Sequence, residues 1–187
     1  MPRVLIVSTD IVGPAMAGPG IRAWELARAL AGEFAVTLAA PLGMRNPDQG
    51  KHQDESGVEG SEFSEFRLAP YAFGRPGALA EALADADVVV GQGFVFAEHP
   101  ELLASALPLA IDLYDPLLLE ALDLYGAQSA EDATAHHRRY LALTAAMLRR
   151  GDFFFCATER QRDYWLGALS ALGRVNALTY AQDHTLR

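Results

Sequence analysis

The feature that most constrains the fold of this chain is a regular alternation of short apolar runs with longer amphipathic segments. Six runs have the composition of buried strands: residues 4–7, 34–40, 63–68, 87–91, 109–113 and 153–157. Segments with helical character separate most of them: residues 21–30, 78–84, 97–107, 117–124, 130–150 and 158–172. Because strands that alternate with helices build βαβ units, we expect an α/β domain with a doubly wound, mainly parallel, Rossmann-like sheet.

Length and composition fit one globular domain covering residues 1–187. The chain is 51% hydrophobic and 21% charged, so it can bury a core without crosslinks. Residues 43–60 are polar and rich in Gly, Asp and Gln, and we expect a long mobile loop there. Apolar runs are too short to span a bilayer and residues 1–8 are too short for a signal peptide, so we expect a soluble cytoplasmic protein.

Charge and cysteine content exclude several classes of protein. The 15 basic and 24 acidic residues give a net charge of −9, a poor match for a nucleic acid backbone. The single cysteine, Cys156, excludes an internal disulfide framework and a multi-cysteine zinc site. The adjacent histidines His136 and His137 lack partners at ligand spacing, so we expect no metal.

Arginines gather on one side of the helix predicted over residues 130–150. Positions about three turns apart repeat this residue type, namely Arg138, Arg139, Arg149 and Arg150. Such a stripe can make a peripheral contact with anionic lipids at the inner face of the membrane. The favoured alternative is a solvated arginine face.

The turn over residues 8–20 is the first candidate site, because parallel α/β sheets bind ligands beyond the carboxyl ends of their strands. It ends in Gly18, Pro19 and Gly20, directly before a helix that carries Arg22. Glycines there let backbone N–H groups approach a phosphate or a sugar, and Arg22 adds a charge-assisted contact. The alternative is that the glycines only shape a tight turn. Neither a complete phosphate loop nor the dinucleotide fingerprint is present, which disfavours an ATPase or a dehydrogenase.

The run over residues 109–113 leads into a second candidate turn. Strand alternation places Asp112 and Tyr114 on one face and leaves Asp115 opposite. A carboxylate at the mouth of a parallel sheet is costly to desolvate, so we interpret Asp112 as a group for hydroxyl recognition or general base catalysis. Asp115, which precedes Pro116, equally fits a helix N-cap.

Two further turns supply binding candidates. Gln92 can hydrogen-bond a sugar or base, and Gly93 allows close backbone approach, although both residues also suit a plain turn. Thr158 and Gln161 fit a capping box, which is the favoured interpretation of Thr158. Arg160, in the same segment, is placed to face an anion.

In this order along the chain, these motifs resemble family 4 of the retaining glycosyltransferases, which have the GT-B fold. The likeness spans most of the chain and is carried by residues 4–8, 13–22, 112–116 and 156–167. It implies the amino-terminal, acceptor-side domain of an enzyme that moves a sugar from a nucleotide-diphosphate sugar to a sugar, lipid or other small-molecule acceptor. It also implies that Gly18 and Gly20 approach the donor phosphates and the acceptor. Many members carry a histidine where this chain has Asp112, Tyr114 and Asp115.

The resemblance also implies a carboxyl-terminal domain that holds the nucleotide sugar. Residues 1–187 show no second Rossmann pattern, so we expect a piece of a longer enzyme, with about 150–200 further residues in that domain. We expect no cofactor in this half and no sugar transfer by it alone. One alternative is a flavodoxin-like binding or regulatory module without catalytic activity. Another is a single-domain enzyme that uses Asp112 as its base, with a raised pKa.

Overall fold

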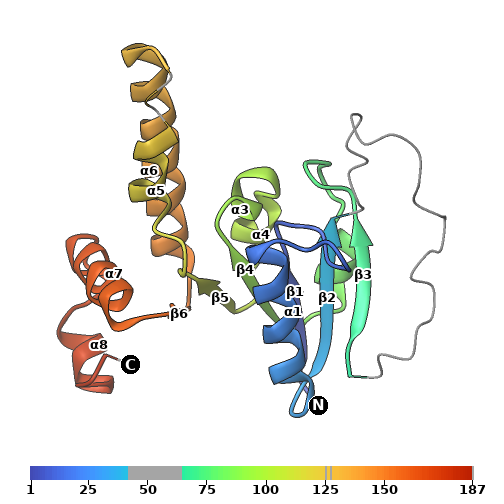
Figure 1. Cartoon of the computed structure of the whole chain (residues 1–187). Coiled ribbons are helices and arrows are strands. Elements are labelled where there is room, and N and C mark those ends of the chain that lie inside the picture. The colour runs from blue at the N-terminus through green and yellow to red at the C-terminus, as the bar shows by residue number, and fades with distance from the viewer. Residues whose placement is uncertain (42–64, 125, 127, 187) are drawn as a thin grey trace. The chain divides into compact units, whose positions relative to one another are not determined.

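The structure, a computed structural model, describes residues 1–41, 65–124, 126 and 128–186 (Figure 1). Its six strands form one parallel sheet in the order β3-β2-β1-β4-β5-β6. Helices connect successive strands along most of the chain. This confirms the predicted α/β class and the doubly wound, Rossmann-like topology. The chain divides into two compact units, Met1–Val89 and Val90–Arg187, which are described separately below.

The first unit contains β1 (Arg3–Val7), α1 (Gly18–Ala31), β2 (Ala35–Pro41), β3 (Arg67–Tyr71), α2 (Ala80–Ala84) and the start of β4 (Val88–Gln92). The second unit contains the rest of β4, followed by α3 (Val95–Glu98), α4 (Glu101–Ala104), β5 (Leu109–Asp112), α5 (Leu117–Leu124), α6 (Ala130–Arg150), β6 (Phe153–Phe155), α7 (Glu159–Ala171) and α8 (Ala177–Gln182).

In the first unit, β1 and β2 form the core together with α1. All residues of β1 after Arg3 are buried, as expected for a strand covered on both faces. The small residues Ala23 and Ala27 are buried on α1, which lies along these strands (Figure 1). Pro70 lies in β3, an edge strand, where a missing N–H is tolerated.

Two predictions for this unit concern residues 43–68. The loop predicted over residues 43–60 lies outside the described residues. The strand predicted over residues 63–68 begins later, at Arg67, and continues to Tyr71. Tyr71 is 4% exposed, and its phenol donates a hydrogen bond to the carbonyl oxygen of Ser8 at 2.7 Å, which ties the end of β3 to the end of β1.

In the second unit, β5 and β6 are parallel neighbours with Ala110 opposite Phe153. The helices α5 and α6 lie side by side and have the bounds that the sequence predicts (Figure 1). Ser129 caps α6, because its hydroxyl oxygen accepts a hydrogen bond from the N–H of Asp132 at 3.1 Å.

The single helix predicted over residues 97–107 is wrong. The chain forms two short helices there, α3 and α4, which are separated by His99 and Pro100. Proline has no N–H to donate and disfavours helical backbone at the preceding residue, so the first helix ends before Pro100. The sequence analysis also missed α8, which Asn176 begins with a capping box.

Candidate functional site

The largest gathering of predicted site residues in the second unit lies where β4 and β5 end. Gln92 is the last residue of β4 and Asp112 the last residue of β5, and they are 8% and 3% exposed. Tyr114 and Asp115 follow in the turn before α5 and are half-buried. We call Gln92, Asp112, Tyr114 and Asp115 the strand-end cluster.

Tyr114 joins the other three members of the strand-end cluster. Its phenol forms hydrogen bonds with the carboxylate of Asp115 and with the side-chain amide of Gln92. Its main-chain N–H donates to Oδ1 of Asp112 at 3.2 Å. Burial, helped by the charge of Asp115 and by the hydrogen bond to it, raises the pKa of Tyr114 to about 12. The phenol therefore keeps its proton at neutral pH and acts as a donor.

The predicted orientation of Asp115, opposite to Tyr114, is wrong. Strand β5 ends at Asp112, so the alternation of side chains along a strand does not extend into the turn. The turn brings the Asp115 carboxylate to the Tyr114 phenol. The main-chain oxygen of Asp115 accepts from the N–H of Leu117 at 2.9 Å as α5 begins, and capping of α5 by the carboxylate stays a prediction.

The surroundings of the strand-end cluster are acidic. Burial and the charge of Asp115 raise the pKa of Glu120, which lies in the first turn of α5. With Asp112, three carboxyl groups therefore belong to this region, and their field disfavours a bound phosphate. Carboxylate, amide and phenol groups together instead suit the hydroxyl groups of a neutral ligand, because each can donate to or accept from a hydroxyl.

The glycines beside Gln92 have structural roles, Gly91 in packing and Gly93 in the backbone turn. A Cβ atom on Gly91 would lie 2.7 Å from the ring of Phe96, which is 1% exposed. Gly93 has φ +50°, in the left-handed region that favours glycine, as the chain turns from β4 toward α3. Within this turn, Gln92 is the residue whose side chain joins the strand-end cluster.

In the first unit, Gly18, Pro19 and Gly20 lie inside the first turn of α1 rather than ahead of it. Proline is tolerated in the first turn because its missing N–H has no partner within the helix. A Cβ atom on Gly20 would clash with the carbonyl oxygen of Ile11, so this glycine is required by the chain's own preceding turn. A Cβ atom on Gly18, in contrast, would have no described atom within 4 Å.

Gly18 and Arg22 come together on one surface of α1. They line a shallow hollow of about 350 Å³ with Ile21, Glu25 and Leu26. The N-cap residue of α1 is Ala17, which offers no side-chain hydrogen bond to the first turn. An anion at such a helix end gains about 0.3–1 kcal/mol from the helix dipole. Gly20 does not share this surface role, because it faces Ile11.

The candidates at the start of α7 divide between capping and exposure. Oγ1 of Thr158 accepts from the N–H of Gln161 at 3.2 Å, and Oε1 of Gln161 accepts from the N–H of Thr158 at 3.2 Å. The predicted capping box is therefore confirmed. Arg160 is exposed in the first turn of α7, and its role toward an anion stays a prediction.

The arginine stripe of α6 is not uniform. Arg150 pairs with Asp152 at 2.8 Å and donates to the carbonyl oxygens of Ser105 and Leu107 at 2.6 and 2.7 Å. This guanidinium group therefore crosslinks the second unit internally. Arg138, Arg139 and Arg149 are exposed, and contact with a membrane stays a prediction for them.

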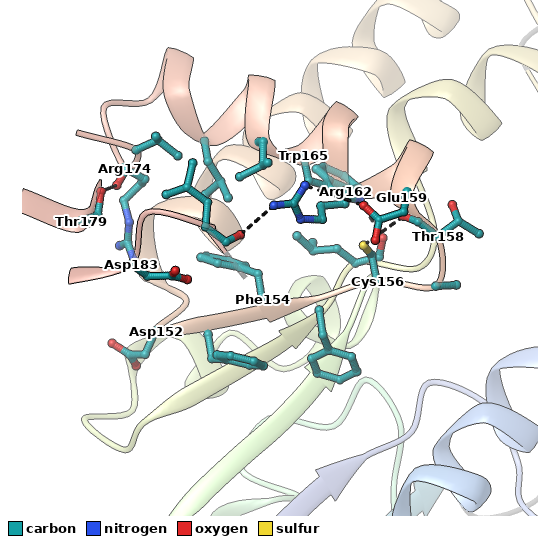
Figure 2. A pocket seen from close by; sticks show the side chains of 18 residues that line it. Asp152, Phe154, Cys156, Thr158, Glu159, Arg162, Trp165, Arg174, Thr179 and Asp183 are labelled. Carbon is teal, nitrogen blue, oxygen red and sulfur yellow. Dashed lines mark hydrogen bonds and ion pairs between the residues drawn. The ribbon is translucent and has the colours of Figure 1, made fainter. Parts of the chain in front are cut away.

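The sequence analysis did not foresee a hollow of about 720 Å³ among β6, α7 and α8 (Figure 2). Aromatic residues from β6 and α7 line it, including Phe154 and Trp165. Arg174 donates to the carbonyl oxygens of Arg149 and Gly151, both at 2.7 Å, and Arg162 donates to that of Thr185 at 2.7 Å. Both guanidinium groups are therefore bound by other parts of the chain, and Arg162 also pairs with Glu159 and Asp163 at 3.8 Å. The run of three phenylalanines over residues 153–155 was the available signal.

Across residues 1–41, 65–124, 126 and 128–186, no group of three or more His, Cys, Asp or Glu side chains is arranged to hold a metal ion. None of the helices formed by these residues is both long enough and apolar enough to cross a membrane. No protein-family model matches the chain, and a search of curated proteins found no significant match.

Proposed function

We propose that this chain is the acceptor-side domain of a glycosyltransferase that moves a sugar from a nucleotide-diphosphate sugar to an acceptor hydroxyl. The observation that carries the proposal is the strand-end cluster at the carboxyl ends of two parallel strands. In open α/β sheets, ligands bind at this end of the strands. Gln92, Asp112, Tyr114 and Asp115 offer donors and acceptors of the kind that bind sugar hydroxyl groups.

The two units take different parts in the proposal. The acidic strand-end cluster binds the neutral acceptor, because a phosphate there would meet three carboxyl groups. In the first unit, taken by itself, the start of α1 lacks a side-chain cap, and Arg22 offers a positive charge to an anionic group such as a donor phosphate beside the carboxylate of Glu25 in the same hollow. The nucleotide sugar itself is assigned to a second Rossmann-like domain of the enzyme.

Asp112 is the candidate base of this half. When an acceptor hydroxyl attacks the anomeric carbon, the new C–O bond forms, the bond to the departing phosphate breaks, and the hydroxyl proton must leave. Asp112 is buried, and the N–H of Tyr114 holds its Oδ1 in place. In this proposal, its carboxylate accepts that proton. The flavodoxin-like module without catalysis stays the alternative.

The test is a titration of the ¹⁵N-labelled 187-residue chain with methyl α-glucoside, methyl α-mannoside and UDP-glucose, followed by amide chemical shifts. We expect one of the two glycosides to shift the amides of Gly93, Leu113 and Tyr114. Asp112→Asn, which keeps the shape but removes the charge, should weaken that binding at least tenfold. Asp123→Asn is the matched control, because Asp123 is exposed on α5.

Two results would count against the proposal. The proposed acceptor site would be refuted if neither glycoside shifted the amides of the strand-end cluster. It would also be refuted if a glycoside bound Asp112→Asn as tightly as the wild type. Sugar transfer from UDP-glucose by the 187-residue chain alone, at an enzyme's rate, would refute its assignment as one half of the enzyme.

A further inference from the structure

The start of α7 reaches the turn that carries two members of the strand-end cluster. The side-chain amide nitrogen of Gln161 donates a hydrogen bond to the carbonyl oxygen of Tyr114. One helical turn later, Nε1 of Trp165 donates to the carbonyl oxygen of Leu113 at 2.7 Å. Residues four apart project from the same face of a helix, so one face of α7 binds two consecutive carbonyl groups of the turn after β5.

The orientation of the Gln161 amide follows from its neighbours. Its Oε1 accepts from the N–H groups of Ala157 and Thr158 at 2.9 and 3.2 Å, so its NH₂ group must face the carbonyl oxygen of Tyr114. A flipped amide would set oxygen against oxygen and N–H against N–H. The amide thus bonds at both ends, and it links the start of α7 to the turn after β5.

A capping box does not need the bond to Tyr114. The box uses only the side-chain oxygen of the third helical residue, and glutamate serves there as well as glutamine. The NH₂ group of Gln161 is therefore an addition to the cap, and it acts on a residue 47 positions away in the chain. Trp165, which Figure 2 shows on α7, is 4% exposed and makes the second attachment through a buried hydrogen bond.

Tyr114 is consequently held at three places. Its N–H is bonded to Asp112, its carbonyl oxygen to Gln161, and its phenol to Asp115 and Gln92. We propose that Gln161 is a positioning residue of the strand-end cluster, which keeps the Tyr114 phenol at Asp115 and Gln92 by holding the Tyr114 carbonyl group. The inference rests on the proposed function for its meaning in saccharide binding, although the geometry of Tyr114 can be tested without it.

Three variants separate positioning from capping. Gln161→Met has a similar length but loses the cap and the donor together. Thr158→Ala loses the hydroxyl part of the cap and keeps the donor to Tyr114. Gln161→Glu keeps an oxygen for the cap and places an acceptor against the Tyr114 carbonyl oxygen, so it loses the donor alone.

The first readout is the pKa of the Tyr114 phenol, followed by NMR of tyrosine labelled at the ring carbon Cζ and assigned with Tyr114→Phe. In the wild type we expect a pKa of about 12. In Gln161→Met it should fall toward the ordinary tyrosine value near 10, because the freed turn exposes the ring to water. In Thr158→Ala it should stay near the wild-type value. Equal pKa values in the wild type and Gln161→Met, or the same fall in Thr158→Ala, would overturn the inference.

The second readout is the affinity for whichever methyl glycoside binds the wild type. Gln161→Glu should still fold, with a lower melting temperature because the bond to the Tyr114 carbonyl oxygen is lost, and at a temperature where it is fully folded it should lose at least threefold in affinity. An unchanged affinity would contradict the inference. If Gln161→Met does not fold, this comparison decides the question. If no glycoside binds the wild type, the proposed function fails, and the pKa comparison still decides whether Gln161 positions Tyr114.

Discussion

The turn before α1 and the turn after β5 both have the sequence of a ligand-binding loop, yet their conspicuous residues act differently. Before α1, Gly20 leaves room for the carbonyl oxygen of Ile11. The hydroxyl group of Ser8 donates to the main-chain oxygen of Asp10 at 2.7 Å and accepts from the N–H of Asp10 at 3.2 Å. The residues of this turn therefore make most of these contacts with one another. After β5, side chains from separate parts of the second unit meet at the phenol of Tyr114.

The difference teaches which signal to weigh. A glycine next to a helix reports a close approach of backbone, and the partner in that approach is often the chain itself. Polar side chains that follow separate parallel strands converge on one place, and burying them is costly unless they bind one another or a ligand. The second pattern is therefore the better evidence for a binding site.

The largest expected effect tests the glycines of α1. Gly20→Ala should lower the free energy of unfolding by about 1–3 kcal/mol, because its methyl group would force the Ile11 carbonyl group to move. Gly18→Ala should be neutral or stabilise the chain by up to about 1 kcal/mol, because it adds a helix-forming residue in open space. Urea unfolding of both variants measures the difference. Equal losses would show that the two glycines share one role.

A smaller effect is expected at the turn after β5. Tyr114→Phe should cost about 0.5–1.5 kcal/mol of stability, because the phenol loses its hydrogen bonds to Asp115 and Gln92. Tyr180→Phe is the control, since Tyr180 is 51% exposed on α8. Thermal unfolding of the two variants is the measurement. No loss in Tyr114→Phe would mean that the strand-end cluster is not held together by this residue.

The sequence predicted most of the fold, because strand and helix periodicity is local. It predicted the bounds of α5 and α6 and the capping box at Thr158, since each depends on neighbours a few residues away. The break at Pro100 was visible in the sequence, but the apolar pattern across it was given more weight. The bond from Gln161 to Tyr114 was not predictable, because it joins distant positions through the packing of α7.

Alkaline pH should weaken the second unit through Tyr114. Its pKa is raised to about 12 by burial, so its contribution to stability is complete below pH 10 and is lost as the pH rises from 10 to 12. The stability difference between the wild type and Tyr114→Phe should shrink over this range. Urea unfolding at several pH values measures it, and the other tyrosines cancel in the comparison. A constant difference would contradict the raised pKa.

Acid should lower the stability of the first unit, by a smaller amount than alkaline pH lowers that of the second. Hydrogen bonds from the Arg3 side chain and N–H hold the pKa of Asp87 at about 2, so its contribution is present above pH 4 and is lost as the pH falls from 4 to 2. Asp87→Asn has no carboxyl group to protonate at this position. The difference in the free energy of unfolding between the wild type and Asp87→Asn should therefore shrink as the pH falls from 4 to 2. Because the ion pair between Arg3 and Asp87 is exposed, 1 M NaCl should reduce its contribution to stability. A wild-type advantage that persists at pH 2 would exclude this mechanism.

The central claim is that the strand-end cluster binds a saccharide through Asp112. The most direct measurement is the ratio of glycoside dissociation constants between Asp112→Asn and the control Asp123→Asn, obtained by titration of the two folded variants under identical conditions. The account predicts a ratio of ten or more, because Asp112 is buried in the strand-end cluster whereas Asp123 is exposed on α5. A ratio of one would contradict it.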